Sequence, residues 1–402
     1  MAYQSGRHFL QIPGPTNVPD RVLRAIDSPT IDHRGPDAPG LTLACLEGMK
    51  AVFKTKGAVV IFPSSGTGAW ESALVNTLSA GDGVLGFDNG HFASQWARMA
   101  RNLDLNAELM GGDWRRAPDA DALRDRLERD SQHALKAVMV VHNETSTGVK
   151  SDIPAIRRAI DSAKHPALLM VDTISSLASM DYRHDEWGVD VSVSGSQKGL
   201  MLPPGLSFNA ISEKAIAASR RSTLPKSYWR WDEMLESNIK GYFPYTPATN
   251  LLYGLREALK MLIDEEGLEN VFKRHDRHAE ATRRAVRAWG LEVFAQDPAE
   301  FSSALTAVLL PAGFNEAEVR EVILKNFNMS LGAGLSKVAG KVFRIGHLGY
   351  FNDLMLAGTL CGVEMGLVIA GVPCKTGGVA EALTYLTAQA KESGAVALSA
   401  NR

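Results

Sequence analysis

The sequence predicts an α/β fold in which a mostly parallel sheet is covered by helices and followed by a smaller C-terminal α+β domain. Three observations lead to this prediction. Short, continuous apolar runs alternate with longer helical patterns, which is typical of strands buried on both faces of a parallel sheet. One of these runs ends at Asp172 and another leads through a short turn to Lys198, and both side chains can take part in catalysis. At 402 residues, the chain is long enough for two or three domains.

The first two-thirds of the chain supply the expected parallel sheet. The expected strands are 59–62, 83–87, 137–141, 168–171, 189–193 and 206–211. Helical patterns lie between them at 70–78, 119–129 and 154–163. Ligands of such sheets bind beyond the carboxyl ends of the strands, where Asp172, Lys198 and the loop after Phe62 all fall.

A second unit is expected after a long helical pattern at 251–266, which Gly267 stops. The patterns that follow are a helix at 268–289, strands at 291–294 and 305–310, a helix at 316–327 and a strand at 341–345. We therefore expect an N-terminal segment over 1–20, a large cofactor-binding domain over 21–265 and a small domain over 266–402.

Composition argues against several classes of partner. The 43 basic and 45 acidic residues nearly cancel and form no basic block, which argues against nucleic acid. The three cysteines are too scattered for a disulfide framework or a zinc cluster, so we expect no metal site and a reducing compartment. The apolar stretch 354–372 contains Glu364 and suits a helix packed on a core better than a membrane span. We expect a cytoplasmic protein without membrane partners.

Lys198 and Asp172 suggest a cofactor. Lys198 follows the run 190–194 through a small polar turn, and Asp172 ends the apolar run 167–171. A lysine can form a Schiff base with an aldehyde cofactor while an acid holds a protonated pyridine nitrogen, which is pyridoxal phosphate chemistry. Taken alone, Lys198 reads as an exposed loop lysine and Asp172 as a turn cap. Their combination with a phosphate-type loop is harder to produce by chance.

That loop, 64–69, follows a strand and opens a helix. Its small residues would let backbone N–H groups at the helix N-terminus approach a phosphate, and its hydroxyls add donors. An ordinary Ser/Thr/Gly helix cap is the alternative. The loop lacks the third glycine of a dinucleotide fingerprint and the Gly-Lys ending of a P-loop, which disfavours a nicotinamide dehydrogenase.

Three further residues are candidates for binding. Arg344 lies inside an apolar strand pattern and needs an acceptor, which is either a substrate carboxylate or a structural ion pair. Arg34 lies in an exposed-looking segment. Phe92 could stack on a flat cofactor ring or simply belong to the core.

Together these motifs resemble the class V aminotransferases of fold type I. Similar segments are Pro13-Gly14-Pro15-Thr16, 62–74, 142–149 and 194–198, and the likeness covers nearly the whole chain. The stretches 32–36, 243–247 and 330–349 resemble the branch that uses serine and glyoxylate.

The resemblance implies a role for each matching residue. Lys198 would hold pyridoxal 5′-phosphate, and Asp172 would pair with its ring nitrogen. Thr145 would hydrogen-bond the ring hydroxyl and Phe92 would stack on the ring. The phosphate would be held by Thr67, Gly68, Ala69 and Gln197.

Other implied roles concern the substrate and a second subunit. Arg344 would bind the substrate carboxylate. Tyr245 and Thr246 would reach the phosphate of the neighbouring subunit, and His33 and Arg34, also from the neighbour, would help select the substrate. The active unit would then be a homodimer or a homotetramer.

The implied reaction is a ping-pong transamination that converts L-serine and glyoxylate into hydroxypyruvate and glycine. Alanine–glyoxylate and serine–pyruvate transfer remain open, because all three reactions need the same lysine and arginine. A lyase resembling cysteine desulfurases would need a nucleophilic cysteine near 326–338, where the sequence has none. A non-catalytic binding module would not need Lys198 and Asp172 together.

Overall fold

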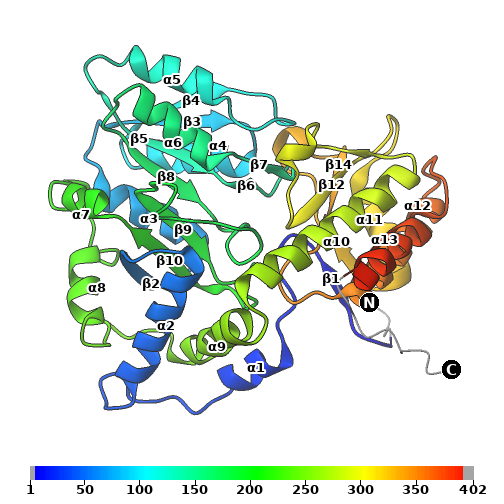
Figure 1. Ribbon diagram of the computed structural model, residues 1–402, viewed down its shortest axis with the longest axis horizontal. Coiled ribbons are helices and arrows are strands. Elements are labelled where there is room, and N and C mark those ends of the chain that lie inside the picture. The colour runs from blue at the N-terminus through cyan, green and yellow to red at the C-terminus, as the bar shows by residue number, and fades with distance from the viewer. Residues whose placement is uncertain (1–4, 393–402) are drawn as a thin grey trace.

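The structure is a computed structural model that describes residues 5–392, and its largest feature is a seven-stranded sheet (Figure 1). In spatial order the strands are β2 (Ala58–Ser64), β10 (Gly205–Ile211), β9 (Val191–Gly195), β8 (Leu168–Asp172), β5 (Leu135–Val141), β3 (Gly83–Asp88) and β4 (Asn106–Gly111). Strand β10 runs in the opposite direction to the other six strands, so the predicted mostly parallel sheet is confirmed.

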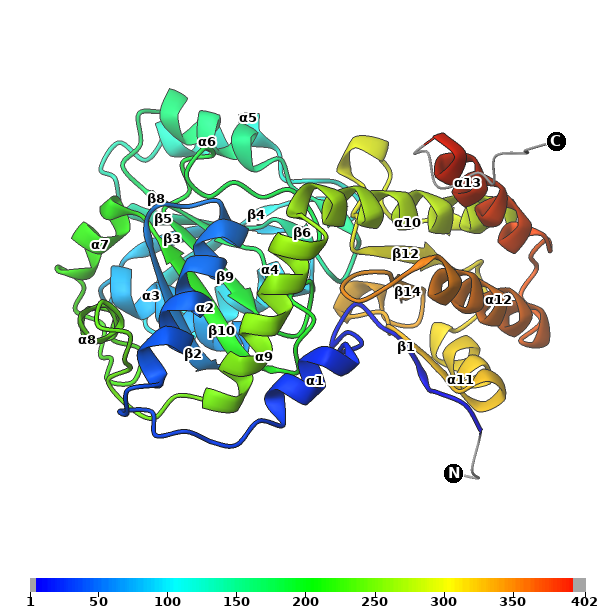
Figure 2. The same ribbon diagram turned by 60° about the horizontal axis from the view of Figure 1, so that its bottom comes forward.

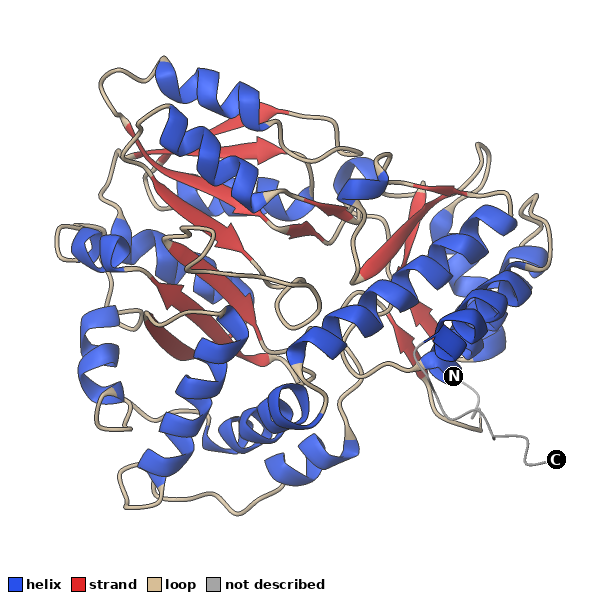
Figure 3. Ribbon diagram, in the orientation of Figure 1, coloured by secondary structure: helices blue, strands red, loops and turns tan. Residues whose placement is uncertain are grey.

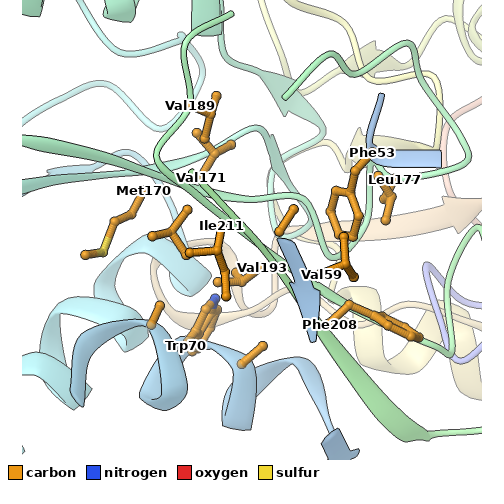
Figure 4. Close-up of a cluster of buried hydrophobic side chains, with 14 of the residues drawn as sticks. Phe53, Val59, Trp70, Met170, Val171, Leu177, Val189, Val193, Phe208 and Ile211 are labelled. Atoms are coloured by element: carbon orange, nitrogen blue, oxygen red, sulfur yellow. The ribbon is translucent and has the colours of Figure 1, made fainter. Parts of the chain in front are cut away.

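Helices cover both faces of this sheet (Figure 3). The helices of this part of the chain are α1 (Asp20–Ile26), α2 (Ala38–Phe53), α3 (Gly66–Thr77), α4 (His91–Asn102), α5 (Ala120–Glu128), α6 (Ile153–Ser162), α7 (Glu213–Ser219), α8 (Trp231–Asn238) and α9 (Thr249–Leu259). Figure 4 shows Trp70 of α3 on one side of the strands and Phe53 of α2 on the other. Asn209 of β10 donates to the Ala69 carbonyl of α3 at 3.1 Å, which fixes α3 against the sheet.

The remainder forms a smaller α+β part. A π-helical segment, Lys260–Glu265, continues α9 and leads towards α10 (Leu268–Ala288). The other elements are β11 (Glu292–Val293), β12 (Leu305–Leu309), α11 (Glu316–Phe327), β13 (Met329–Leu331), β14 (Val342–Gly346), α12 (Asp353–Ile369) and α13 (Gly378–Glu392). Strands β11, β12 and β14 form an antiparallel sheet, and β1 (Phe9–Gln11) pairs with β13.

Two main hydrophobic cores follow this division. The larger core runs from Val22 to Val271, and a second core runs from Ala281 to Leu386. Helix α10 contributes to both and passes from the main sheet to α12 and α13 (Figure 2). The expected domain limits at 20/21 and 265/266 stay predictions. Among the described residues, no helix is long and apolar enough to cross a membrane.

Candidate active site

A pocket lies at the carboxyl ends of β8 and β9, the edge that the sequence predicted. Its lining is Ser65, Gly66, Thr67, Trp70, Phe92, Thr145, Asp172, Ile174, Gln197 and Lys198. The fold thus brings together six of the predicted cofactor-binding residues from five separate segments of the chain. Gly68 and Ala69 continue α3 directly behind Thr67.

Lys198 is buried, and the N-terminal segment Pro13-Gly14-Pro15-Thr16 contacts it. Its Nζ donates a hydrogen bond to the carbonyl of Pro13, and its own carbonyl accepts one from Thr16 Oγ1 at 3.1 Å. Burial, helped by the positive charge of Arg344, lowers the pKa of Lys198 to about 8. A substantial share of the amine is therefore neutral near physiological pH, as a nucleophile or base requires.

Gly14 allows this close approach. Its φ is +100°, and a Cβ there would lie 2.3 Å from Lys198 Cδ and 2.6 Å from Nζ. Only glycine combines that backbone conformation with room for the lysine.

Asp172 is buried on the other side of the pocket and has two donors. Its Oδ1 accepts from the N–H of Ile174 at 2.7 Å, and its Oδ2 accepts from Trp70 Nε1 at 2.9 Å. Burial raises the pKa of Asp172 to about 7, although both donors act in the opposite direction. A cation placed beside this carboxylate would restore its ionisation.

Trp70 is a site residue that the sequence analysis missed. Its ring stacks on Trp96, with centroids 5.8 Å apart and planes 12° apart, which sets the direction of its N–H. The available signal was a tryptophan directly after the phosphate-type loop, since a buried indole N–H needs an acceptor.

The first turn of α3 is prepared for an anion. Within the described chain no side chain caps this helix, and its first turn contains no acidic residue. At Gly68 a Cβ would lie 1.9 Å from Ser64 Oγ, so this position has no room for a side chain. Gln197 lines the same pocket, and its amide nitrogen can donate hydrogen bonds to an anion. Free N–H groups at a helix N-terminus attract phosphate.

Glu144 is a second residue that the sequence analysis missed. It is fully buried at the end of β6 (Asn143–Glu144), where the loop that contains Thr145 begins, and it accepts hydrogen bonds from Ser146 and from the start of α4. Thr145 Oγ1 donates to Ser175 Oγ at 2.8 Å, which fixes the same loop on the opposite side.

Arg344 lies in the middle of β14 and is only 7% exposed. Its Nε donates to the carbonyl of Ala333 at 2.7 Å and its Nη1 to the carbonyl of Thr145 at 2.8 Å. No carboxylate in residues 5–392 forms an ion pair with it, which disfavours the structural ion pair. Burial lowers the pKa of Arg344 to about 10, so it remains a cation with capacity for a carboxylate.

Arg344 is absent from the described lining of the pocket, and so are the remaining four predicted residues, His33, Arg34, Tyr245 and Thr246. Thr246 Oγ1 lies 3.4 Å from His33 Nε2, so these two segments meet each other. Tyr245 stacks on Tyr228, with centroids 4.5 Å apart, and its hydroxyl donates to the Tyr228 carbonyl. Their expected action on a neighbouring subunit stays a prediction.

Comparison with known proteins agrees with this geometry. Residues 8–347 match the family model described as aminotransferase class-V. The serine–glyoxylate aminotransferase of Methylorubrum extorquens is 50% identical over 95% of this chain and 96% of that protein. The L-aspartate–glyoxylate aminotransferase of Paracoccus denitrificans is 46% identical over 92% of this chain and 94% of that protein.

A solved structure agrees as well. Pyridoxamine–pyruvate aminotransferase from Mesorhizobium loti matches with a TM-score of 0.90 and 26% identity, covering 97% of this chain and 100% of that chain. The protein therefore has the fold-type I aminotransferase architecture. The chain belongs to the class V aminotransferase family, which confirms the resemblance found in the sequence.

Proposed function

We propose that this aminotransferase uses pyridoxal 5′-phosphate to convert L-serine and glyoxylate into hydroxypyruvate and glycine. The observation that carries the proposal is that buried Lys198, buried Asp172 and an uncapped helix N-terminus share one pocket. The relative from Methylorubrum extorquens supports serine and glyoxylate as the substrates. When bound, this cofactor accepts the electrons released at the amino acid's Cα.

The residues of the pocket fit this cofactor. Lys198 Nζ would hold its aldehyde carbon, and Asp172, with a pKa of about 7 that a nearby cation lowers, would pair with a protonated ring nitrogen. Thr145 and Phe92 would bind the ring hydroxyl and the ring face. Thr67, Gly68, Ala69 and Gln197 would hold the phosphate, in agreement with the uncapped N-terminus of α3 and the donating amide nitrogen of Gln197.

Lys198 would also move the proton. Once the substrate amine replaces it, its Nζ is free in its neutral form to take the proton from the substrate Cα. The lowered pKa of about 8 supports this role, because an ordinary lysine would hold its own proton near neutral pH. The carbonyl of Pro13 would orient the amine between the two half-reactions.

Arg344 would bind the substrate carboxylate. Serine and glyoxylate each carry one carboxylate, so a single arginine can serve both half-reactions. The two carbonyls that hold the guanidinium fix its orientation without neutralising it.

Alternative amino donors exist within the same family. The relative from Paracoccus denitrificans is named for L-aspartate, and transfer from alanine or to pyruvate needs the same residues. A desulfurase-like lyase has no support, since none of Cys45, Cys361 and Cys374 is in the described lining of the pocket that contains Lys198, and Cys45 is buried with its pKa raised to about 12.

We further propose a homodimer as the smallest active unit, with His33, Arg34, Tyr245 and Thr246 completing the partner's site. Contact between His33 and Thr246 supports a shared surface for these two segments. A homotetramer would keep the same pairing. Sedimentation velocity, which measures the mass in solution, tests both states.

The first experiment is an absorbance titration of the purified protein with pyridoxal phosphate, then L-serine, then glyoxylate. We expect a visible band that serine bleaches and glyoxylate restores. Bleaching by L-alanine or L-aspartate but not by serine would keep the cofactor and change the donor. Absence of any cofactor band would contradict the proposed role of Lys198.

A further inference from the structure

Helix α4 begins in an unusual way, because its capping groups come from a distant loop. At its start, three consecutive N–H groups need acceptors that the helix itself cannot supply. His91 N–H donates to Ser146 Oγ at 3.0 Å, Phe92 N–H to Glu144 Oε1 at 3.4 Å and Ala93 N–H to Glu144 Oε2 at 3.1 Å. Glu144, at the end of β6, and Ser146, in the loop that follows it, therefore replace a local helix cap.

Glu144 is held firmly in this position. Its Oε1 also accepts from the N–H of Ser146 at 3.0 Å and from Ser146 Oγ at 2.6 Å, and the side chain is fully buried. Gly90 provides the necessary space, because a Cβ there would lie 2.1 Å from Glu144 Cγ. A carboxylate at a helix N-terminus also interacts favourably with the helix dipole.

The two sides of this contact both belong to the pocket. On the helix side, Phe92 is in the first turn of α4 and is one of the residues that line the pocket. On the loop side, Thr145 lines the pocket and its carbonyl accepts from Arg344. Glu144 therefore links the first turn of α4, which carries Phe92, to the loop in which the Thr145 carbonyl accepts from Arg344.

We propose that Glu144 is a positioning residue that holds the Phe92 ring against the cofactor. The proposal rests on the proposed function, since it concerns the ring that pyridoxal phosphate would place in this pocket. Glu144 touches neither substrate nor cofactor in this role. It acts by fixing the first turn of α4, and with it the position from which Phe92 enters the pocket.

Glu144→Ala is the principal variant, and the dissociation constant of pyridoxal phosphate and the visible circular dichroism of the bound cofactor are the readouts. We expect the dissociation constant to rise about tenfold, the effect of losing a helix cap that supports a binding surface. The dichroic band, which depends on how the ring is held, should lose intensity. Glu144→Gln keeps one acceptor oxygen and should fall between Glu144→Ala and the wild type.

Two further variants make the test specific. Asp119→Ala removes a local cap from α5, where Asp119 accepts from the N–H groups of Asp121 and Ala122, and α5 lies outside the pocket lining. It should lower thermal stability and leave both cofactor readouts unchanged. In a Phe92→Leu background, Glu144→Ala should change the dissociation constant by less than about twofold, because little is left to position.

If Glu144→Ala does not fold, Ser146→Ala perturbs the same cap more mildly and should raise the dissociation constant about threefold. A wild-type dissociation constant and dichroic band in the folded variants would overturn the inference. An undiminished effect of Glu144→Ala in the Phe92→Leu background would overturn it too. Failure of the wild-type chain to bind pyridoxal phosphate would instead overturn the proposed function.

Discussion

The candidate residues fall into two groups whose surroundings differ. The group around Lys198 is largely buried, tied by hydrogen bonds and gathered in one pocket. The group of His33, Arg34, Tyr245 and Thr246 is half-buried or exposed and lies outside the described pocket lining. The residues proposed to carry out the reaction are thus assembled within one chain. The second group gains a role only if another chain supplies the pocket it acts on.

The strongest test of the first group is Lys198→Ala. We expect transamination to fall by at least about 10⁴-fold, because the variant loses both the amine that binds the cofactor and the base that moves the proton. Circular dichroism in the far ultraviolet should be unchanged. Lys136→Ala, at an exposed lysine, is the control and should keep full activity. Normal turnover by Lys198→Ala would remove the pocket from the mechanism.

Arg344→Ala should have the next largest effect. We expect KM for serine and for glyoxylate to rise by the equivalent of about 2–5 kcal/mol, because a buried, charge-assisted contact with each carboxylate is lost. Arg344→Lys keeps the charge without the bidentate geometry, so KM should rise less than in Arg344→Ala. Steady-state kinetics with each substrate varied in turn measure both values. An unchanged KM for either substrate would contradict a single shared carboxylate site.

The rate at which cofactor-free protein captures pyridoxal phosphate should depend on pH through Lys198. Only the neutral amine attacks an aldehyde, and the pKa of Lys198 is lowered to about 8. Below that pH, the rate should therefore fall about tenfold for each pH unit. Arg344→Ala should move the midpoint to higher pH, because it removes a positive charge that helps to lower this pKa. Stopped-flow absorbance gives the rate, and a midpoint above pH 10 would contradict the burial of the amine.

The second group is tested by mixing chains. Lys198→Ala and Thr246→Ala are each expected to be poorly active alone. A dimer that contains one of each has one pocket with both residues intact, so random reassembly should restore about a quarter of wild-type activity. Mixing after mild dissociation, followed by an activity assay, measures the recovery. No recovery despite exchange of chains would place Thr246 outside the partner's site.

The sequence was most informative where buried strands end in chemical groups. Continuous apolar runs gave the six predicted strands, since a strand buried on both faces needs no polar alternation. It missed β4, which lies at the sheet edge, is only partly buried and mixes polar with apolar residues instead of forming a continuous apolar run. Helix α4 was missed as well, because its cap comes from a loop about fifty positions later.

The candidate site divides in the same way. Lys198, Asp172 and the loop before α3 stand out because each follows a strand, and local sequence records that position. Trp70, Glu144 and Pro13 lie in segments that resemble the family, but their roles do not stand out, because their contacts join segments that only the folded chain brings together. Long-range hydrogen bonds of this kind leave no periodic pattern in the sequence.

Trp70→Phe should have the smallest effect and tests how firmly the first group is held. The substitution keeps a ring against Trp96 but removes the N–H that donates to Asp172 Oδ2. We expect kcat/KM to fall about fivefold, since a hydrogen bond to a charged group contributes about 1 kcal/mol or more. Loss of a donor that favours the carboxylate raises the pKa of Asp172, so the acid limb of the pH–rate profile should move to higher pH.

Trp96→Phe is the matched control, because its ring belongs to the same stack while its Nε1 has no hydrogen-bond partner among the described residues. A shifted acid limb in Trp70→Phe alone would assign the effect to the hydrogen bond. An equal shift in both variants would assign it to packing.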